Sequence, residues 1–140
     1  MPIELTKKLI DIPSVSGAEA DVTRFLADHL ESLGYEVERQ TVENDRENIF
    51  AVLPGRTPRV VFSTHLDTVP PFIPAREDDD YIYGRGACDA KGIIAAQIAA
   101  AEKLRREGAR DLGLLFLVDE EMGSIGARLA GKSPRARGCR

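Results

Sequence analysis

Two short apolar runs on either side of a helical segment constrain the fold of this chain more than any other feature. Val60–Phe62 and Leu112–Val118 are rich in branched residues and lack a helical period, which is typical of buried strands. The segment between them, Ala90–Gly108, is predicted to be a helix. A strand–helix–strand crossover makes the two strands parallel, so that their carboxyl ends meet at one edge of the sheet. The sequence therefore predicts an α/β fold with a ligand site at that edge.

Five side chains suited to metal binding or acid–base chemistry lie next to this edge. They are His65 and Asp67 after the first strand, Asp89 at the start of the helix, and Glu120 and Glu121 after the second strand. Carboxylates packed together repel one another unless a cation neutralises them. His with Asp and Glu is a ligand set typical of zinc. Ordinary exposed loop charges explain any one of these residues better, but three clusters brought together by the topology favour a metal site.

The glycine-rich stretch before the helix has two interpretations. Gly84-Arg-Gly86 suggests a phosphate-binding loop, but the G-x-G-x-x-G pattern is missing and Lys91 is followed by glycine rather than Ser or Thr. We therefore expect these glycines to let the backbone turn tightly towards a metal. Lys91 and Arg85 are expected to neutralise part of the carboxylate cluster.

Three motifs carry a resemblance to a known family. They are Ser63-Thr-His-Leu-Asp-Thr-Val69, Tyr83-Gly-Arg-Gly-Ala-Cys-Asp-Ala-Lys-Gly92 and Asp119-Glu-Glu121. In order and spacing they resemble the motifs of the metallohydrolase family that includes acetylornithine deacetylase, succinyl-diaminopimelate desuccinylase, aminoacylase and carboxypeptidase G. The resemblance runs from about Leu5 to Gly126. Three motifs in order form a far more specific signal than any one of them alone.

The resemblance implies a role for each residue at the predicted edge. It implies two divalent metal ions, zinc with cobalt as an alternative. His65 would bind one ion, Glu121 the other, and Asp89 would bridge both. Asp67 would orient the His65 ring, and Glu120 would act as the general base. Members of the family also hold the peptide bond after Asp89 in the cis form, so we expect a cis bond here.

By the same resemblance, residues 1–140 form the N-terminal part of a metallohydrolase catalytic domain. The implied architecture is a three-layer α/β/α fold with a mixed, centrally parallel sheet. The family completes its site with a further acidic ligand and a late histidine. Both would lie beyond Arg140, together with the rest of the catalytic domain and any lid or dimerisation domain. We therefore expect the 140 residues alone to be inactive.

The activity that the resemblance implies is hydrolysis of an amide bond, with removal of an N-acyl group from an amino acid or a derivative of one. Two alternatives stay open. One is a metallo-exopeptidase of the same family, and the other is a non-catalytic metal-binding or interaction fragment. The expected partners are a small N-acyl amino acid or peptide substrate and, for a full-length protein, a second copy of itself.

Composition and charge argue against several other classes. With 43% hydrophobic and 30% charged residues, the 140-residue chain is predicted to be globular and of single-domain size. The formal net charge of −4 argues against binding to nucleic acid or to an anionic membrane. No apolar run is long enough to span a bilayer and no apolar h-region follows Met1, so we expect a cytoplasmic protein. Cys88 and Cys139 lack metal-ligand spacing, and Cys88 is expected to be a packing residue.

The first third of the chain is expected to supply two helices. Ile3–Ile12 is predicted to form the first. Ser16 and Glu19 have the spacing of a capping box that opens the second, which ends at Gly34. His29 lies at the edge of the apolar stripe of that helix, and we expect it to pack there rather than to bind a metal. The other predicted elements are antiparallel strands at Tyr35–Val42 and Asn48–Leu53, a stiff loop at Val69–Pro74, a solvated turn at Glu77–Asp80, a short helix at Ser124–Leu129 and a basic tail at Lys132–Arg140.

Overall fold

The helices and strands lie close to their predicted positions. The computed structural model of the chain describes residues 2–133. In chain order the elements are α1 (Pro2–Ile10), α2 (Ala20–Ser32), β1 (Glu36–Glu43), β2 (Arg46–Val52), β3 (Val60–His65), β4 (Arg76–Glu77), β5 (Ile82–Tyr83), α3 (Lys91–Arg106), β6 (Leu112–Leu117) and α4 (Ile125–Ala130). Every predicted helix and strand is present, with its ends shifted by a few residues at most.

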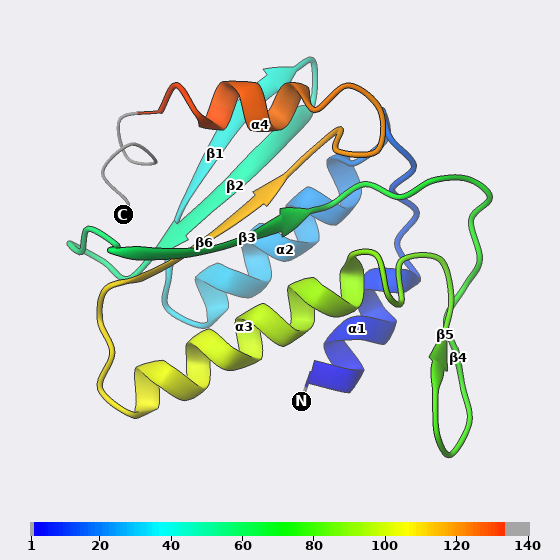
Figure 1. Ribbon diagram of the computed structural model, residues 1–140, viewed down its shortest axis with the longest axis horizontal. Helices are drawn as coiled ribbons and strands as arrows, with labels where there is room; N and C mark the ends of the chain where they lie inside the picture. Colours follow the sequence, from blue (N-terminus) through cyan, green and yellow to red (C-terminus); the bar gives the residue numbers. More distant parts are fainter. Residues whose placement is uncertain (1, 134–140) are drawn as a thin grey trace.

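A four-stranded mixed sheet carries the fold (Figure 1). Its strand order is β1-β2-β6-β3, with antiparallel β1–β2 and β2–β6 pairs and a parallel β6–β3 pair. Helices α1, α2 and α3 lie on one side of the sheet and α4 on the other. The predicted three-layer α/β fold with a mixed sheet is confirmed. The parallel pair β6–β3 lies at one end of the described sheet rather than at its centre.

The strand–helix–strand crossover is formed by β3, α3 and β6. The parallel register runs from Val60 opposite Leu112 to His65 opposite Leu117, so both strands end at the same edge of the sheet. Within residues 2–133, β3 has no strand on its other side. Val60 is therefore 46% exposed, whereas Phe116 of the inner strand β6 is fully buried. The prediction of a buried strand holds for β6 and fails for β3, because β3 is an edge strand.

The hydrophobic core lies between the sheet and helices α1, α2 and α3. Its fully buried members include Leu9, Leu26, Leu30, Ile94, Leu114 and Phe116. Helix α3 buries Ile94 and Ile98 but leaves Ile93 43% exposed. Helix α3 is therefore an outer layer that packs on the sheet with one side only.

Helix α2 begins without the predicted capping box. Glu19 occupies the N-cap position, and no side chain caps the helix. The Ser16 hydroxyl donates instead to Asp67, a residue far along the chain. The Glu19 carboxylate is fully buried and accepts hydrogen bonds from the Arg46 guanidinium. Both side chains therefore serve long-range contacts rather than the start of the helix.

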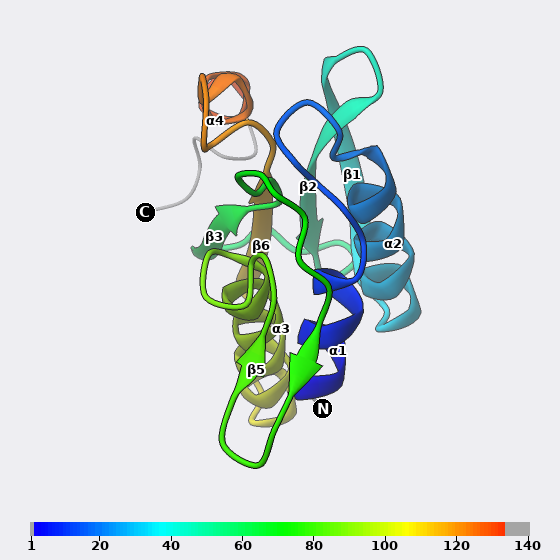
Figure 2. The same ribbon diagram turned by 90° about the vertical axis from the view of Figure 1, so that its right-hand side faces the viewer.

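A small hairpin of β4 and β5 projects from the body of the molecule (Figure 2). The Asp78 carboxylate accepts the N–H groups of Asp80 and Tyr81 and the hydroxyl of Tyr83. These bonds are confined to an exposed turn, which confirms the predicted solvated turn. The preceding proline-rich loop contains a cis bond between Pro70 and Pro71.

The structure confirms some of the smaller expectations and contradicts others. His29 is half-buried with its ring stacked on Phe25, so its packing role is confirmed. Cys88 is exposed, which contradicts its expected packing role. Cys139, and the predicted basic tail from residue 134 onward, lie outside the described residues. None of the described helices combines the length and the hydrophobicity needed to cross a bilayer.

Candidate metal centre

The five side chains predicted at the sheet edge come together in the structure. His65 ends β3, Asp89 precedes α3, and Glu121 follows β6. One ligand atom from each of these three residues lies within 4.8 Å of the others. Among residues 2–133, no other group of three His, Cys, Asp or Glu side chains has this geometry. The backbone topology thus brings three potential metal ligands from separate elements to one place.

The His65 ring is held through both of its nitrogens. Nδ1 lies 3.0 Å from the main-chain oxygen of Asp67 and 3.3 Å from its Oδ1. Nε2 lies 2.9 Å from Oδ1 of Asp89 and 3.7 Å from Oε2 of Glu120. In the metal-free chain the hydrogen bond to Asp67 raises the pKa of His65 to about 9, against the effect of burial and with help from Asp89. Fixing Nδ1 points Nε2 towards the carboxylates, which is the orientation that a metal ligand needs.

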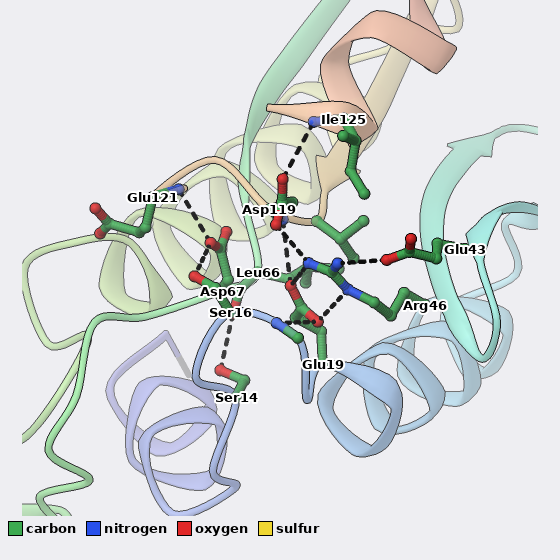
Figure 3. Close-up of polar contacts among 12 residues, drawn as sticks. Ser14, Ser16, Glu19, Glu43, Arg46, Leu66, Asp67, Asp119, Glu121 and Ile125 are labelled. Carbon is green, nitrogen blue, oxygen red and sulfur yellow. Dashed lines mark hydrogen bonds and ion pairs between the residues drawn. The ribbon is translucent and has the colours of Figure 1, made fainter. Parts of the chain in front are cut away.

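Asp67 contacts the His65 ring and also bonds to Ser16 and to the turn after β6 (Figure 3). Its buried carboxylate accepts the Ser16 hydroxyl at 2.6 Å and the N–H groups of Glu120 and Glu121, each at 3.0 Å. Burial by itself would raise the pKa of Asp67, but the contacts with His65, Ser16 and the two N–H groups outweigh it and lower the pKa to about 2. The carboxylate is therefore ionised, and its hydrogen bonds join β3 to the turn after β6.

The expected protein cations lie elsewhere. Lys91 is buried and donates to the carbonyl oxygen of Ile12, and Arg85 donates to the carbonyl oxygens of two prolines. The expectation that these two residues neutralise the carboxylates is wrong, because each is bound to backbone oxygens. Burial, followed by the charge of Asp89, raises the pKa of Glu121. A partly buried set of one imidazole and several carboxylates, without a bound lysine or arginine, fits a divalent cation.

The turn after β6 directs the two adjacent glutamates. Asp119 has a positive φ of 66°, and its carboxylate accepts the N–H groups of Gly123 at 3.0 Å and Ile125 at 3.4 Å. The backbone of this turn presents the N–H groups of Glu120 and Glu121 to Asp67. The side chain of Glu120 is 53% exposed and lies beside the ligand cluster. Glu121 is half-buried within it.

The glycine-rich loop before α3 allows a close approach of the backbone. Gly84 has a φ of +145°, and a Cβ added there would lie 2.5 Å from Cγ2 of Ile10. Gly86 has a φ of +93° and is packed against the Lys91 side chain. The bond between Asp89 and Ala90 is cis, as the family resemblance implies. These glycines permit the tight course that ends at Asp89.

Three residues next to the site were not predicted to belong to it: Ser16, Glu19 and Arg46. The sequence pattern predicts a helix cap for Ser16 and Glu19, and Arg46 lies outside the predicted strands. The sequence offers one signal, because Arg46 lies shortly before the apolar run at residues 49–52 and is the first residue of β2. A buried arginine requires carboxylate partners. The sequence does not say which carboxylates those are.

Comparison with known proteins finds relatives of this chain in one peptidase family. The model of peptidase family M20/M25/M40 matches residues 61–137, which is more than half of the chain. The chain is 45% identical over 133 residues to a peptidase M20 domain-containing protein of Schizosaccharomyces pombe, covering 90% of this chain and 33% of that protein. It is 46% identical over 138 residues to a probable carboxypeptidase of Emericella nidulans, covering 90% of this chain and 32% of that protein. The chain thus spans about a third of the length of these curated relatives.

The fold is also found among solved structures. The crystal structure of the aminopeptidase PepT from Bacillus cereus superposes with a TM-score of 0.79 at 24% sequence identity, covering 97% of this chain and 40% of that one. At this level of identity the likeness concerns the fold. The match of the family model over residues 61–137 identifies the chain as a member of peptidase family M20/M25/M40.

Proposed function

We propose that this chain supplies the N-terminal part of the catalytic domain of a metal-dependent amide hydrolase. The observation that carries the proposal is the convergence of His65, Asp89 and Glu121 within 4.8 Å, with Glu120 beside them. Membership of a peptidase family supports cleavage of an amide bond. The remaining ligands, a further acidic residue and a histidine, would follow Arg140 in the complete protein. Sequencing the gene beyond the codon for this residue tests that part of the proposal.

The proposed roles of the residues come from the family resemblance, and the contacts described above are compatible with them. Bound divalent ions, zinc or cobalt, would polarise the amide carbonyl and lower the pKa of a water molecule. His65 and Glu121 would each hold one ion, with Asp89 shared between them. Glu120 is placed beside these ligands, so its carboxylate would take a proton from the attacking water and deliver it to the leaving amine. Asp67 would keep Nδ1 of His65 protonated and the ring fixed.

Two substrate classes are compatible with this site. An N-acyl amino acid and a short peptide both present an amide bond to the same catalytic groups. A peptide substrate is supported by the name of the relative from Emericella nidulans, which is a probable carboxypeptidase. The deacylase assignment rests on the sequence motifs that resemble acetylornithine deacetylase and aminoacylase. We therefore propose deacylation of an N-acyl amino acid as the first candidate and exopeptidase cleavage as the second.

A substrate panel separates these candidates. The full-length protein, loaded with zinc or cobalt, is assayed on N-acetylated amino acids, on dipeptides and on peptides with a free C-terminus. Turnover of the first group alone supports a deacylase, and turnover of peptides supports an exopeptidase. Absence of turnover on every substrate, by a protein that retains its metal, would favour the non-catalytic alternative.

A further inference from the structure

A buried ion cluster holds Asp119, which directly precedes Glu120 and Glu121 in the turn after β6 (Figure 3). Arg46, which is only 7% exposed, places its guanidinium between Glu19 and Asp119. Nε and Nη2 of Arg46 donate to the two oxygens of Glu19 at 2.9 and 2.8 Å, and Nη2 also donates to Oδ1 of Asp119 at 2.7 Å. Nη1 reaches the more exposed Glu43 at 3.2 Å. The guanidinium thus joins β2 to the segment before α2 and to the turn after β6.

Glu19 holds the backbone of the same turn as well. Its Oε1 accepts the N–H of Asp119 at 3.2 Å, and its Oε2 accepts the N–H of Gly17 at 3.0 Å. Asp119 is therefore fixed at its N–H by Glu19 and at its carboxylate by Arg46. The next two residues along the chain are Glu120 and Glu121, which the site uses. Movement of Asp119 would change the direction of both glutamates.

The segment before α2 also contacts the other half of the site. Ser16 donates its hydroxyl to Asp67 at 2.6 Å, and Asp67 contacts the His65 ring. The short stretch from Ser16 to Glu19 therefore contacts both sides of the centre, the His65 side through Asp67 and the Glu121 side through Asp119. Neither the contact of Ser16 with Asp67 nor that of Glu19 with Asp119 involves a candidate ligand residue directly.

Stability alone is a weak reason for such a cluster. Replacement of a buried ion pair by apolar residues of similar volume is often neutral or stabilising, because the desolvation of the charges offsets their attraction. A bidentate arginine–carboxylate contact does fix direction, since the planar guanidinium accepts few orientations. The cluster is thus better suited to fixing the geometry of a turn than to supplying net stability.

We propose that Ser16, Glu19 and Arg46 are positioning residues that set the separation of His65 and Glu121 and thereby the metal affinity of the centre. This inference rests on the proposed function in one respect, namely that His65, Asp89 and Glu121 bind a divalent metal. Changes in the partners behind metal ligands commonly cost about 10–100-fold in metal affinity. We expect a loss of that size when the hydrogen bonds of this network are removed.

Two variants of the full-length protein test the proposal. Arg46→Lys keeps the positive charge but cannot form the two-pronged contact with Glu19, and Ser16→Ala removes the single hydroxyl that bonds to Asp67. Arg39→Lys is the matched control, because Arg39 forms only longer contacts, 3.4 Å to Asp28 and 3.8 Å to Glu47. Zinc titration calorimetry gives the dissociation constant, and thermal unfolding of the metal-free chain reports stability.

The expected result is a zinc dissociation constant raised about tenfold or more in both variants and unchanged in Arg39→Lys. Amide hydrogen exchange of Glu120 and Glu121 in metal-free protein should become faster in Arg46→Lys. Variants that lose thermal stability but bind zinc like the wild type would overturn the positioning role. If the wild type binds no zinc, the proposed metal centre is wrong. The amide exchange rates of Glu120 and Glu121 in Arg46→Lys then still test whether the network positions these residues. Faster exchange supports it and unchanged exchange overturns it.

Discussion

At the scale of single residues, Glu120 and Glu121 are neighbours in sequence to which we assign different roles. Both donate their N–H groups to Asp67, so their backbones are fixed together. Their side chains nevertheless meet different surroundings. Glu120 is 53% exposed beside the cluster, whereas Glu121 is half-buried and belongs to the ligand group. A catalytic base needs access to water, and a ligand needs a fixed position among other ligands.

Substitution of each glutamate should therefore have a different effect in the full-length protein. Glu120→Ala should lower kcat by about 100-fold or more while zinc remains bound, because it removes the base and keeps the ligands. Glu121→Ala should lose zinc on dialysis. Metal analysis alongside turnover measures both effects. Glu107→Ala is a suitable control, because Glu107 pairs with Lys103 at the far end of α3. Equal zinc loss in both site variants would contradict the division of roles.

Lys91 has an unusual environment for its charge. Its side chain is buried at the start of α3, and burial lowers the pKa from 10.5 to about 8, although Asp11 partly opposes this. Between these two values the unfolded chain binds more protons than the folded chain. The free energy of unfolding should therefore rise with pH across this window, because stability increases with pH wherever the unfolded state holds more protons.

Replacement by methionine should remove this rise. We expect urea unfolding of the metal-free chain, measured below, within and above the window, to show a pH-dependent gain in the wild type that Lys91→Met lacks. Each pKa unit corresponds to about 1.4 kcal/mol. Lys103→Met controls for general effects, since Lys103 is 71% exposed on the same helix. The same pH dependence in wild type and Lys91→Met would show that Lys91 titrates normally.

At the scale of elements, the first turn of α3 is packed against the glycine-rich loop that leads into it. A Cβ added to Gly92 would collide with the carbonyl oxygen of Ala87, a backbone atom that cannot rotate away. Alanine usually stabilises a helix relative to glycine by roughly 0.5–1 kcal/mol. Here the collision should outweigh that gain, because the loop carries Asp89 and its course is fixed on both sides.

Gly92→Ala should therefore destabilise the chain by about 1–3 kcal/mol, the usual cost of overpacking. The control is Gly131→Ala after α4, where φ is −62° and the nearest atom to an added Cβ is 3.5 Å away. Gly131→Ala should be neutral or slightly stabilising. Urea unfolding of the two variants beside the wild type measures the difference. A Gly92→Ala protein as stable as the wild type would mean that the loop moves freely.

At the scale of the whole molecule, the described sheet ends at β3 and the ligand set is small. In the proposed two-metal site, His65, Asp89 and Glu121 would give each ion only two protein ligands, with Asp89 shared. A catalytic zinc ion normally has three protein ligands and a water. Two ligands leave the metal weakly and loosely held, and a loosely placed water attacks poorly.

The 140-residue chain by itself should therefore show no turnover. Purified chain with added zinc or cobalt is assayed on N-acetylated amino acids and dipeptides beside its Glu120→Ala variant. Equal background rates are expected. A rate for the wild-type chain clearly above that of Glu120→Ala would show that further ligands are dispensable, and the assignment of ligands taken from the family would need revision.

The sequence by itself determined the strand–helix–strand crossover and the edge at which the site lies. Strand and helix periods are local properties, and the handedness of the crossover follows from backbone chirality. His65, Asp89 and Glu121 could therefore be placed near one another from their positions relative to three elements. Their order in the motifs then suggested which roles to propose.

Only the tertiary structure decided what lies behind these residues. Ser16 bonds to Asp67 across 51 positions of sequence, and Glu19 to the N–H of Asp119 across 100. A Ser-x-x-Glu spacing fits a local helix cap as well as two long-range contacts, so the pattern does not distinguish them. The partner of a buried charge is fixed by which segments the fold brings together. For that reason Arg46, Glu19 and Lys91 acquire their roles only when the chain is packed.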